Sequence, residues 1–291
     1  MKRWVVGLAG LGLAVAAGLV WAAGSVLTAP ATRPVGPPPR LAVETAAISS
    51  PSGELPTWVA PVDSARGVVV LMHGVRDDRR SQLDRLRLFR DAGYHTIAFD
   101  FQAHGESPGD AITFGWLERD DAVAAVRFAR DRFPGLPVAV VAQSMGGAAA
   151  ILAGPRLDAD ALVVEALYAS LERATRNRLA MRLGRAGAIA APLLTAQVGP
   201  RLGVSLDQLR PARAAPDLDA PLFVLAGSED AHAQPDEARA IYDAAPEPKA
   251  LWIVAGAAHQ DLYRYAPDAY RERVLGFLDG SLGNRTVAQG R

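Results

Sequence analysis

The chain reads Pro137-Val-Ala-Val-Val-Ala142, then Gln143-Ser144-Met145-Gly146-Gly147, then Ala148-Ala-Ala-Ile-Leu-Ala153. The first run is apolar and rich in β-branched residues, which predicts a buried strand. The third run is rich in alanine, which predicts a helix. Ser144 would then stand at a sharp turn between strand and helix, where free N–H groups and the helix dipole favour developing negative charge. The pattern predicts that Ser144 is a nucleophile.

This turn departs in one place from the G-x-S-x-G pattern of nucleophilic serines. Ala142 stands at the first glycine position and adds a methyl group to the turn, whereas Gly146 leaves room for close packing of the helix. On these five residues alone, a serine that merely caps a buried helix is an equal alternative. The rest of the chain must decide whether Ser144 is a nucleophile or a helix cap.

The composition is that of a globular protein and excludes several classes of function. With 291 residues the chain can form one large or two small domains. It has no cysteine, which excludes thiol catalysis, disulfides and thiolate metal sites. It holds 31 basic and 31 acidic residues, but residues 1–40 contain four of the basic ones and none of the acidic ones. The remainder is mildly acidic, which argues against nucleic acid as a partner.

The N-terminal segment is apolar enough to be a membrane anchor. Trp4 to Leu27 carry no charge and follow Lys2 and Arg3. As a helix this segment would measure about 36 Å, and a bilayer hydrocarbon core measures about 30 Å. We therefore expect residues 1–27 to form a membrane anchor, a single transmembrane helix, with the body outside the cytoplasm. The alternative is a cleaved signal peptide and a secreted body.

The rest of the chain divides into three segments. Residues 28–40 contain five prolines, which predicts an extended linker rather than helix or sheet. Residues 41–282 are expected to form a single body, and residues 283–291 a frayed tail. Within the body, an apolar insertion edged by arginines predicts a small helical cap at about residues 171–213. A helix packed directly on the sheet is the alternative for the same residues.

The body alternates strands with helices. Apolar and β-branched runs predict strands, the first two paired as a hairpin, at 41–49, 54–62, 67–72, 94–99, 138–142, 161–169, 221–226 and 249–254. Runs with helical periodicity or helix-ending signals predict helices at 80–92, 115–133, 235–244 and 267–282. This alternation predicts an α/β protein whose mostly parallel sheet is covered by helices on both faces. In such sheets functional groups gather beyond the carboxyl ends of the strands.

Three more strand-end loops carry groups that suit a nucleophilic serine. They read His73-Gly74-Val75, Gly227-Ser-Glu-Asp230 and Gly256-Ala-Ala-His259. A serine hydroxyl needs an imidazole to take its proton, and that imidazole needs a carboxylate to hold its tautomer and stabilise its charge. His259 is the predicted base, because it alone of the five histidines lies in a loop after the last strand. Asp230 is the predicted acid.

Two further runs read Asp100-Phe-Gln-Ala-His-Gly-Glu-Ser107 and Phe114-Gly-Trp-Leu-Glu-Arg-Asp120. Together with the serine turn and the order serine, acid, histidine, they make the chain resemble the alpha/beta-hydrolase superfamily over roughly residues 41–282. Within it the chain is most similar to the bacterial esterase and serine-aminopeptidase-like branch, whose D-x-x-x-H-G-x-S loop the first run matches. The resemblance implies the alpha/beta-hydrolase fold.

The resemblance also implies a role for each site residue. Ser144 would be the nucleophile, His259 the general base and Asp230 the acid that orients the base. The backbone N–H groups of Val75 and Met145 would form the oxyanion hole.

Two other carboxylates are alternatives for the acid, and other histidines have structural explanations. Glu229 lies next to Asp230 and has a longer reach, and Glu165 belongs to the strand after the serine helix. We expect His73 to shape the oxyanion loop and His104 to lie under the floor of the site.

The expected function is hydrolysis of carboxylic esters, acyl or lipid-like, through an acyl-enzyme intermediate, with no cofactor and no metal. The expected partners are a small-molecule ester substrate and, through the N-terminal helix, a membrane. An exported serine peptidase or aminopeptidase is the first alternative, since the same triad cleaves amides. A non-catalytic, membrane-tethered binding protein on a hydrolase scaffold is the second.

Overall fold

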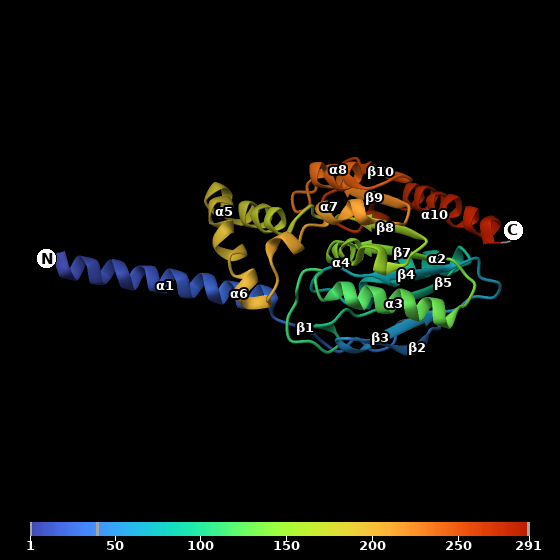
Figure 1. Cartoon of the computed structure of the whole chain (residues 1–291), viewed down its shortest axis with the longest axis horizontal. Coiled ribbons are helices and arrows are strands. Elements are labelled where there is room, and N and C mark those ends of the chain that lie inside the picture. Colours follow the sequence, from blue (N-terminus) through green and yellow to red (C-terminus); the bar gives the residue numbers. More distant parts are fainter. Residues whose placement is uncertain (1, 39–40, 290–291) are drawn as a thin grey trace.

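A computed structural model describes the backbone of residues 2–38 and 41–289, and their side chains except those of residues 2–13, 16 and 284–289. An eight-stranded sheet runs through the body in the order β10-β9-β8-β7-β4-β5-β3-β2 (Figure 1). The strands are β2 (Glu44–Ser50), β3 (Gly53–Ala60), β4 (Val68–Met72), β5 (His95–Phe99), β7 (Val138–Gln143), β8 (Ala161–Glu165), β9 (Leu222–Gly227) and β10 (Lys249–Val254). Only β3 runs antiparallel to the rest of the sheet, and it pairs antiparallel with both of its neighbours, β2 and β5. All eight predicted strands are present, so the predicted fold class is confirmed.

Helices cover both faces of this sheet. They include α2 (Leu83–Asp91), α3 (Glu118–Arg132), α4 (Met145–Ala153), α8 (Pro235–Ala244), α9 (Leu262–Tyr265) and α10 (Pro267–Gln289), with short 3-10 turns η1 (Arg79–Gln82), η2 (Gly154–Leu157) and η4 (Ala215–Asp217). On one face, α3, α4 and α8 pack against side chains such as Val70, and on the other α2 and α10 pack against Leu71. Successive side chains of a strand point to opposite faces. Strand β4 therefore contributes side chains to the hydrophobic core on each face of the sheet, and it is buried throughout.

The N-terminal helix does not support the predicted membrane anchor. Helix α1 (Lys2–Thr28) extends away from the body (Figure 1). Its side chains are described only from residue 14 onward, apart from residue 16, a length of about 22 Å. Among the side chains that the structure describes, no helix is long and apolar enough to cross a membrane. The transmembrane helix expected at residues 1–27 is therefore not supported, and the location outside the cytoplasm stays a prediction.

The C-terminal end of α1 is hydrogen-bonded to the body. Arg201 donates from Nη2 to the carbonyl of Trp21 at 2.7 Å, and its guanidinium lies 4.2 Å from the centre of the Trp21 ring. Gln197 donates to the carbonyl of Val20 at 2.9 Å. The carbonyl of Thr28 accepts from the N–H of Ile112 at 2.8 Å. These contacts fix where the helix leaves the body.

The residues predicted as a linker also lie against the body. Strand β1 (Ala31–Thr32) pairs in parallel with β6 (His104–Gly105). Arg33 then donates from Nε to the Asp78 carboxylate at 2.6 Å and from Nη2 to the Arg76 carbonyl at 2.7 Å. Within the residues predicted as a linker, Ala31–Thr32 thus completes a two-stranded sheet with β6. Residues 39 and 40 lie outside the described part.

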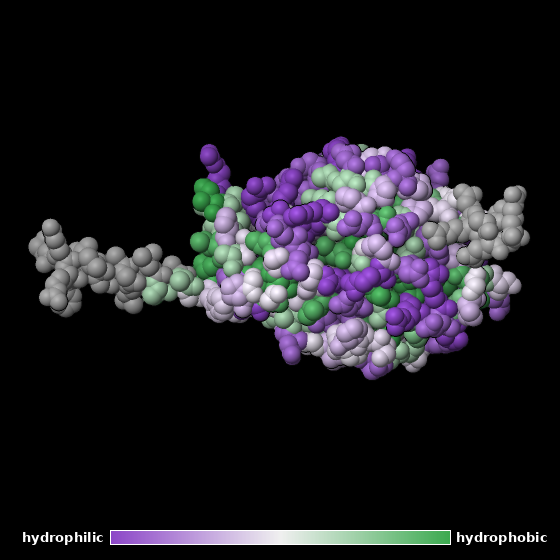
Figure 2. Space-filling model, in the orientation of Figure 1, coloured by the Kyte–Doolittle hydropathy of each residue, from purple (hydrophilic) through white to green (hydrophobic). Residues whose placement is uncertain are grey.

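The inserted residues form a group of helices beside the sheet. They are α5 (Leu171–Thr195), α6 (Val198–Leu202), η3 (Leu206–Gln208) and α7 (Pro211–Ala214). Helix α5 breaks at Gly184, whose φ of 60° and ψ of −147° are not helical. Its large apolar side chains at 181, 183, 189 and 193 are exposed, and Figure 2 shows hydrophobic surface over this part of the cap. The tail predicted to be frayed continues α10 as helical backbone through Gln289.

Candidate active site

Ser144 occupies the strained turn that its sequence context predicts. It connects β7 to α4 with a φ of 48° and a ψ of −113°, a region that non-glycine residues rarely adopt. The turn is held by the Ser144 N–H, which donates to the carbonyl of Glu165 at 2.8 Å, and by the Ser144 carbonyl, which accepts from Ala148. Met145 is the first residue of α4, so its N–H has no partner within the helix.

Gly146 is the residue that lets this turn sit against the neighbouring strand. A Cβ added at Gly146 would lie 2.7 Å from the carbonyl oxygen of His73 and 2.9 Å from that of Met72. Both atoms belong to backbone at the end of β4 and cannot rotate away. A Cβ at Gly147 would meet its nearest neighbours at 3.5 Å, an ordinary contact. A side chain therefore has no room at position 146, whereas it fits at position 147.

This difference predicts opposite effects for two alanine substitutions. We expect Gly146→Ala to lower the free energy of unfolding by about 1–3 kcal/mol through overpacking, and to lower turnover because β4 must shift. Gly147→Ala is the matched control: it sits in the same helix, gains up to about 1 kcal/mol in helix propensity and should leave stability equal or higher. Urea unfolding of both variants measures this. Equal stability of the two would show that the close approach is not needed.

The structure brings Asp230 and His259 together. Asp230 follows β9, and His259 follows β10, its parallel neighbour in the sheet. His259 donates from Nδ1 to Oδ2 of Asp230 at 2.7 Å. The other oxygen, Oδ1, accepts from the N–H groups of His232 and Ala233 at 2.8 and 2.9 Å. The buried Asp230 carboxylate is thus fully hydrogen-bonded, and it holds His259 in the tautomer whose Nε2 can accept a proton.

Gly227 permits the close approach of these two loops. A Cβ at Gly227 would lie 2.1 Å from the carbonyl oxygen of Ala257, two residues before the histidine. Ser144 leaves the same edge of the sheet after β7. Within the described residues its hydroxyl makes no hydrogen bond to His259, as is common at unliganded sites, where this contact tightens once substrate binds.

The oxyanion loop also lies against Ser144. A Cβ at Gly74 would stand 3.6 Å from the Cβ of Ser144, which places Val75, one residue later, beside the nucleophile turn. His73 orders this loop. Its Nε2 accepts from the N–H of Phe101 at 3.1 Å, so Nδ1 carries the proton and donates to the carbonyl of Gly74 at 2.8 Å. Burial, and next the charge of His104, lower the pKa of His73 to about 3, which keeps it neutral.

The loop that matches the family motif at residues 100–107 supports the oxyanion loop. Asp100 accepts from the N–H of Arg79 at 2.7 Å and from that of Glu106 at 2.9 Å, and it pairs with the Arg79 guanidinium. Ser107 donates to the Asp100 carbonyl at 2.6 Å. The His104 ring packs 5.1 Å from the His73 ring. The residues of this motif therefore support the oxyanion loop from behind the active site.

The two alternative acids lie elsewhere. Glu229 is exposed to solvent. Glu165 is buried and accepts from Arg85 at 2.6 and 3.1 Å and from the hydroxyl of Tyr270. Asp261 pairs with the same arginine at 3.0 Å. Glu165 is committed to a buried ion-pair cluster, so of the three candidates the structure joins only Asp230 to His259.

One further histidine, His232, lies at the site, and the sequence assigned it no catalytic role. The ring of His232 lies 4.7 Å from that of His259, inclined by 31°. Its Nδ1 is buried and has no hydrogen-bond partner among the described residues. The available signal was its position two residues after Asp230, in the loop that carries the acid. Within the described residues, no group of three His, Asp or Glu side chains could hold a metal ion.

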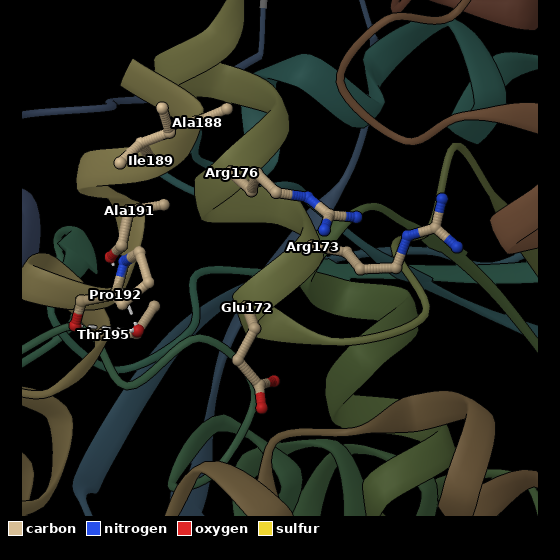
Figure 3. Close-up of a pocket in the computed structure, with 8 residues that line it drawn as sticks. All are labelled: Glu172, Arg173, Arg176, Ala188, Ile189, Ala191, Pro192 and Thr195. Atoms are coloured by element: carbon tan, nitrogen blue, oxygen red, sulfur yellow. Dashed lines mark hydrogen bonds between the residues drawn. The ribbon is translucent and has the colours of Figure 1, made fainter. Parts of the chain in front are cut away.

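A pocket of about 400 Å³ opens within the cap, between the two halves of α5 (Figure 3). Its lining comes from both halves: Glu172, Arg173, Arg176, Ala188, Ile189, Ala191, Pro192 and Thr195. Figure 3 shows arginines on one side and small apolar residues on the other. None of the residues predicted to be catalytic lines this pocket, so it is separate from the serine turn.

Comparison with known proteins agrees with this architecture. Residues 63–182 match the family described as serine aminopeptidase, S33. The uncharacterized protein YqkD of Bacillus subtilis is 25% identical over 226 residues, which cover 76% of this chain and 73% of YqkD. The esterase Pf2001 of Pyrococcus furiosus superposes with a TM-score of 0.73 at 21% identity, over 88% of this chain and 98% of the esterase. The alpha/beta hydrolase GrgF of Penicillium sp. sh18 gives 0.64 at 17% identity, over 84% and 100%.

The sheet order, the strained serine turn and the acid–base pair at one edge, together with these similarities, define the class. The chain has the alpha/beta-hydrolase fold. The fold that the resemblance implies is therefore confirmed, and the similarity to the serine aminopeptidase family over residues 63–182 supports hydrolase activity.

Proposed function

We propose that the protein is a serine hydrolase that cleaves carboxylic esters through an acyl-enzyme intermediate. The observation that carries the proposal is the 2.7 Å hydrogen bond from His259 Nδ1 to a buried, fully bonded Asp230, at the sheet edge where Ser144 occupies its strained turn. A carboxylate that fixes the tautomer of a histidine, at the sheet edge that also carries such a serine, has a direct use in acyl transfer.

The reaction would follow from this geometry. His259 Nε2 accepts the proton of the Ser144 hydroxyl as its oxygen attacks the ester carbonyl. The N–H groups of Val75 and Met145 donate to the oxyanion that develops, which is worth about 10²–10³ in rate for one such donor. The imidazolium then protonates the leaving alcohol. Water activated by the same imidazole hydrolyses the acyl-enzyme and restores the serine.

An aminopeptidase is the second candidate, favoured by the family similarity over residues 63–182. Such an enzyme must bind the cationic α-ammonium group of a peptide, which calls for a free carboxylate beside the site. Asp230 is engaged with His259, and Glu165 with Arg85. Asp77, however, is exposed, and its Oδ2 would lie 3.5 Å from a Cβ at Gly74 in the oxyanion loop, so a carboxylate is present near the serine turn. We place esters first because the esterase Pf2001 superposes over 88% of this chain.

The test is a substrate panel with the purified full chain. We expect hydrolysis of 4-nitrophenyl esters of rising acyl length, little hydrolysis of aminoacyl 4-nitroanilides, and covalent labelling by a fluorophosphonate probe. Faster cleavage of the anilides would establish the peptidase instead. No labelling and no turnover of either class would identify a non-catalytic protein.

A further inference from the structure

We propose that His232 is a positioning residue for the general base: its ring fixes the plane of the His259 imidazole, and Asn177 of the cap helix α5 fixes His232 in turn. This inference deepens the proposed ester hydrolysis and rests on it. His232 takes no part in proton transfer; it acts through the orientation of His259.

The hydrogen bond to Asp230 does not by itself fix the ring of His259. His259 lies in the loop after β10, between the exposed residues Ala258 and Gln260, and is itself partly exposed. Its Nδ1 is held by Oδ2 of Asp230 at 2.7 Å. The ring can still tilt about that atom, which would carry Nε2 away from the Ser144 hydroxyl. A base must stay within hydrogen-bond reach of the proton that it accepts, so a second contact that fixes the ring plane serves the reaction.

The ring of His232 supplies that second contact. Its centre lies 4.7 Å from the centre of the His259 ring, and the two planes are inclined by 31°. The buried Nδ1 of His232 has no hydrogen-bond partner among the described residues, so a fully protonated ring would have an N–H without an acceptor there. Burial, and next the charge of His259, lower the pKa of His232. His232 therefore stays neutral and can pack against His259 while the latter carries the proton.

The backbone of His232 is hydrogen-bonded through both of its polar groups. The N–H donates to Oδ1 of Asp230 at 2.8 Å, and the carbonyl accepts from Nδ2 of Asn177 at 3.0 Å. These two bonds set the direction in which the side chain leaves the loop. A single residue thus contacts the triad acid, the triad base and the cap helix.

Asn177 is a firm partner for this carbonyl because its own amide is buried and bonded twice. The residue is 6% exposed, and Nδ2 also donates to Oε1 of Glu237 at 2.7 Å. Glu237 is fully buried, and its other oxygen accepts from the N–H of Ala169, in the segment after β8, at 2.9 Å. If the Asn177 amide turned away, it would leave two acceptors without their donor, which is costly at buried positions.

The first experiment removes the ring alone. In His232→Ala the backbone N–H and carbonyl remain, so the bonds to Asp230 and Asn177 persist. We expect kcat for a 4-nitrophenyl ester to fall about 10- to 100-fold with little change in KM, because the base is misplaced while the substrate still binds. The rate of labelling by a fluorophosphonate should fall by a similar factor. His232→Phe restores a flat ring without the nitrogens and should recover most of both rates.

His95→Ala is the matched control. His95 begins β5, at the opposite edge of the sheet, and its ring stacks on that of Phe133 at 3.9 Å. This variant should keep the wild-type kcat even if it unfolds at a lower temperature. Proton NMR of the Nδ1–H shared by His259 and Asp230 gives a readout that a loss of stability alone does not change. We expect a sharp signal in wild type, His95→Ala and His232→Phe, and a signal broadened by solvent exchange in His232→Ala.

The second experiment tests the link through the cap. Asn177→Ala should lower kcat in the same direction, and the double variant Asn177→Ala/His232→Ala should be no slower than His232→Ala alone, since both changes act through one ring. Thr175→Ala is the control in the same helix, because the Thr175 hydroxyl donates only within α5, to the carbonyl of Leu171 at 2.8 Å. It should keep the wild-type kcat. Effects of the two variants that multiply would overturn the link through Asn177.

Two results would overturn the positioning role while leaving ester hydrolysis intact. The first is a His232→Ala protein that matches wild type in turnover and labelling. The second is a His232→Phe protein as slow as His232→Ala, which would assign the effect to a nitrogen of the ring instead of its packing. Wild type that neither turns over esters nor reacts with the fluorophosphonate would instead remove the proposed function itself.

Discussion

Ser144→Ala is expected to lower kcat for ester hydrolysis by on the order of 10⁶-fold and to abolish labelling by a fluorophosphonate. The alanine variant keeps a Cβ in the turn between β7 and α4, so the strained backbone and its hydrogen bonds to Glu165 and Ala148 persist. What is lost is the oxygen that forms the acyl-enzyme. Turnover of a nitrophenyl ester and mass spectrometry of the probe adduct measure the two effects.

Ser49→Ala is the matched control for this experiment, because Ser49 is an exposed serine of β2, at the edge of the sheet. It should label and turn over like wild type. If the Ser144→Ala protein still carried the adduct, the nucleophile would lie elsewhere, and the strained turn would have to be explained as a structural feature.

Asp230→Asn is expected to lower kcat by about 10⁴-fold with little loss of fold. The reason lies in the hydrogen bonds of this side chain. Oδ1 accepts from two backbone N–H groups, so the oxygen of the asparagine amide would keep that position and its NH₂ group would face His259. Nδ1 must then accept, which moves the ring proton to Nε2, and the histidine can no longer take the proton of Ser144.

Glu229→Gln is the control for this prediction, since Glu229 is the adjacent carboxylate and is exposed. It should retain wild-type kcat within a few fold. Activity that survives Asp230→Asn but is lost in Glu229→Gln would reverse the assignment of the acid. Circular dichroism and thermal unfolding of both variants verify that the fold is kept.

Much of the site could be predicted because its residues follow strands. Parallel strands that are buried on both faces read as continuous apolar runs, and the polar residue that ends each run lies at one edge of the sheet. This is why Ser144, Asp230 and His259 could be selected although they are far apart in the chain. The bounds of α8 and β10 match for a related reason: prolines mark helix or strand boundaries there.

The N-terminal segment shows what composition leaves out. Hydropathy counts apolar residues but does not show what the helix contacts. In the structure, the side chains of Arg201 and Gln197 donate hydrogen bonds to backbone carbonyls near the end of α1. The five prolines predicted an extended linker. The prolines gave no sign that Arg33 donates from Nη2 to the carbonyl of Arg76, one residue after Val75 in the oxyanion loop.

By itself the sequence determined the class of fold, the serine turn and the short set of candidate acids and bases, because these depend on local periodicity and on the order of strands. Only the tertiary structure separated Asp230 from Glu165, since Arg85 reaches Glu165 from a helix 80 residues earlier in the chain. It alone placed His232 against His259. Pairing between distant side chains depends on packing in three dimensions, and no local pattern records it.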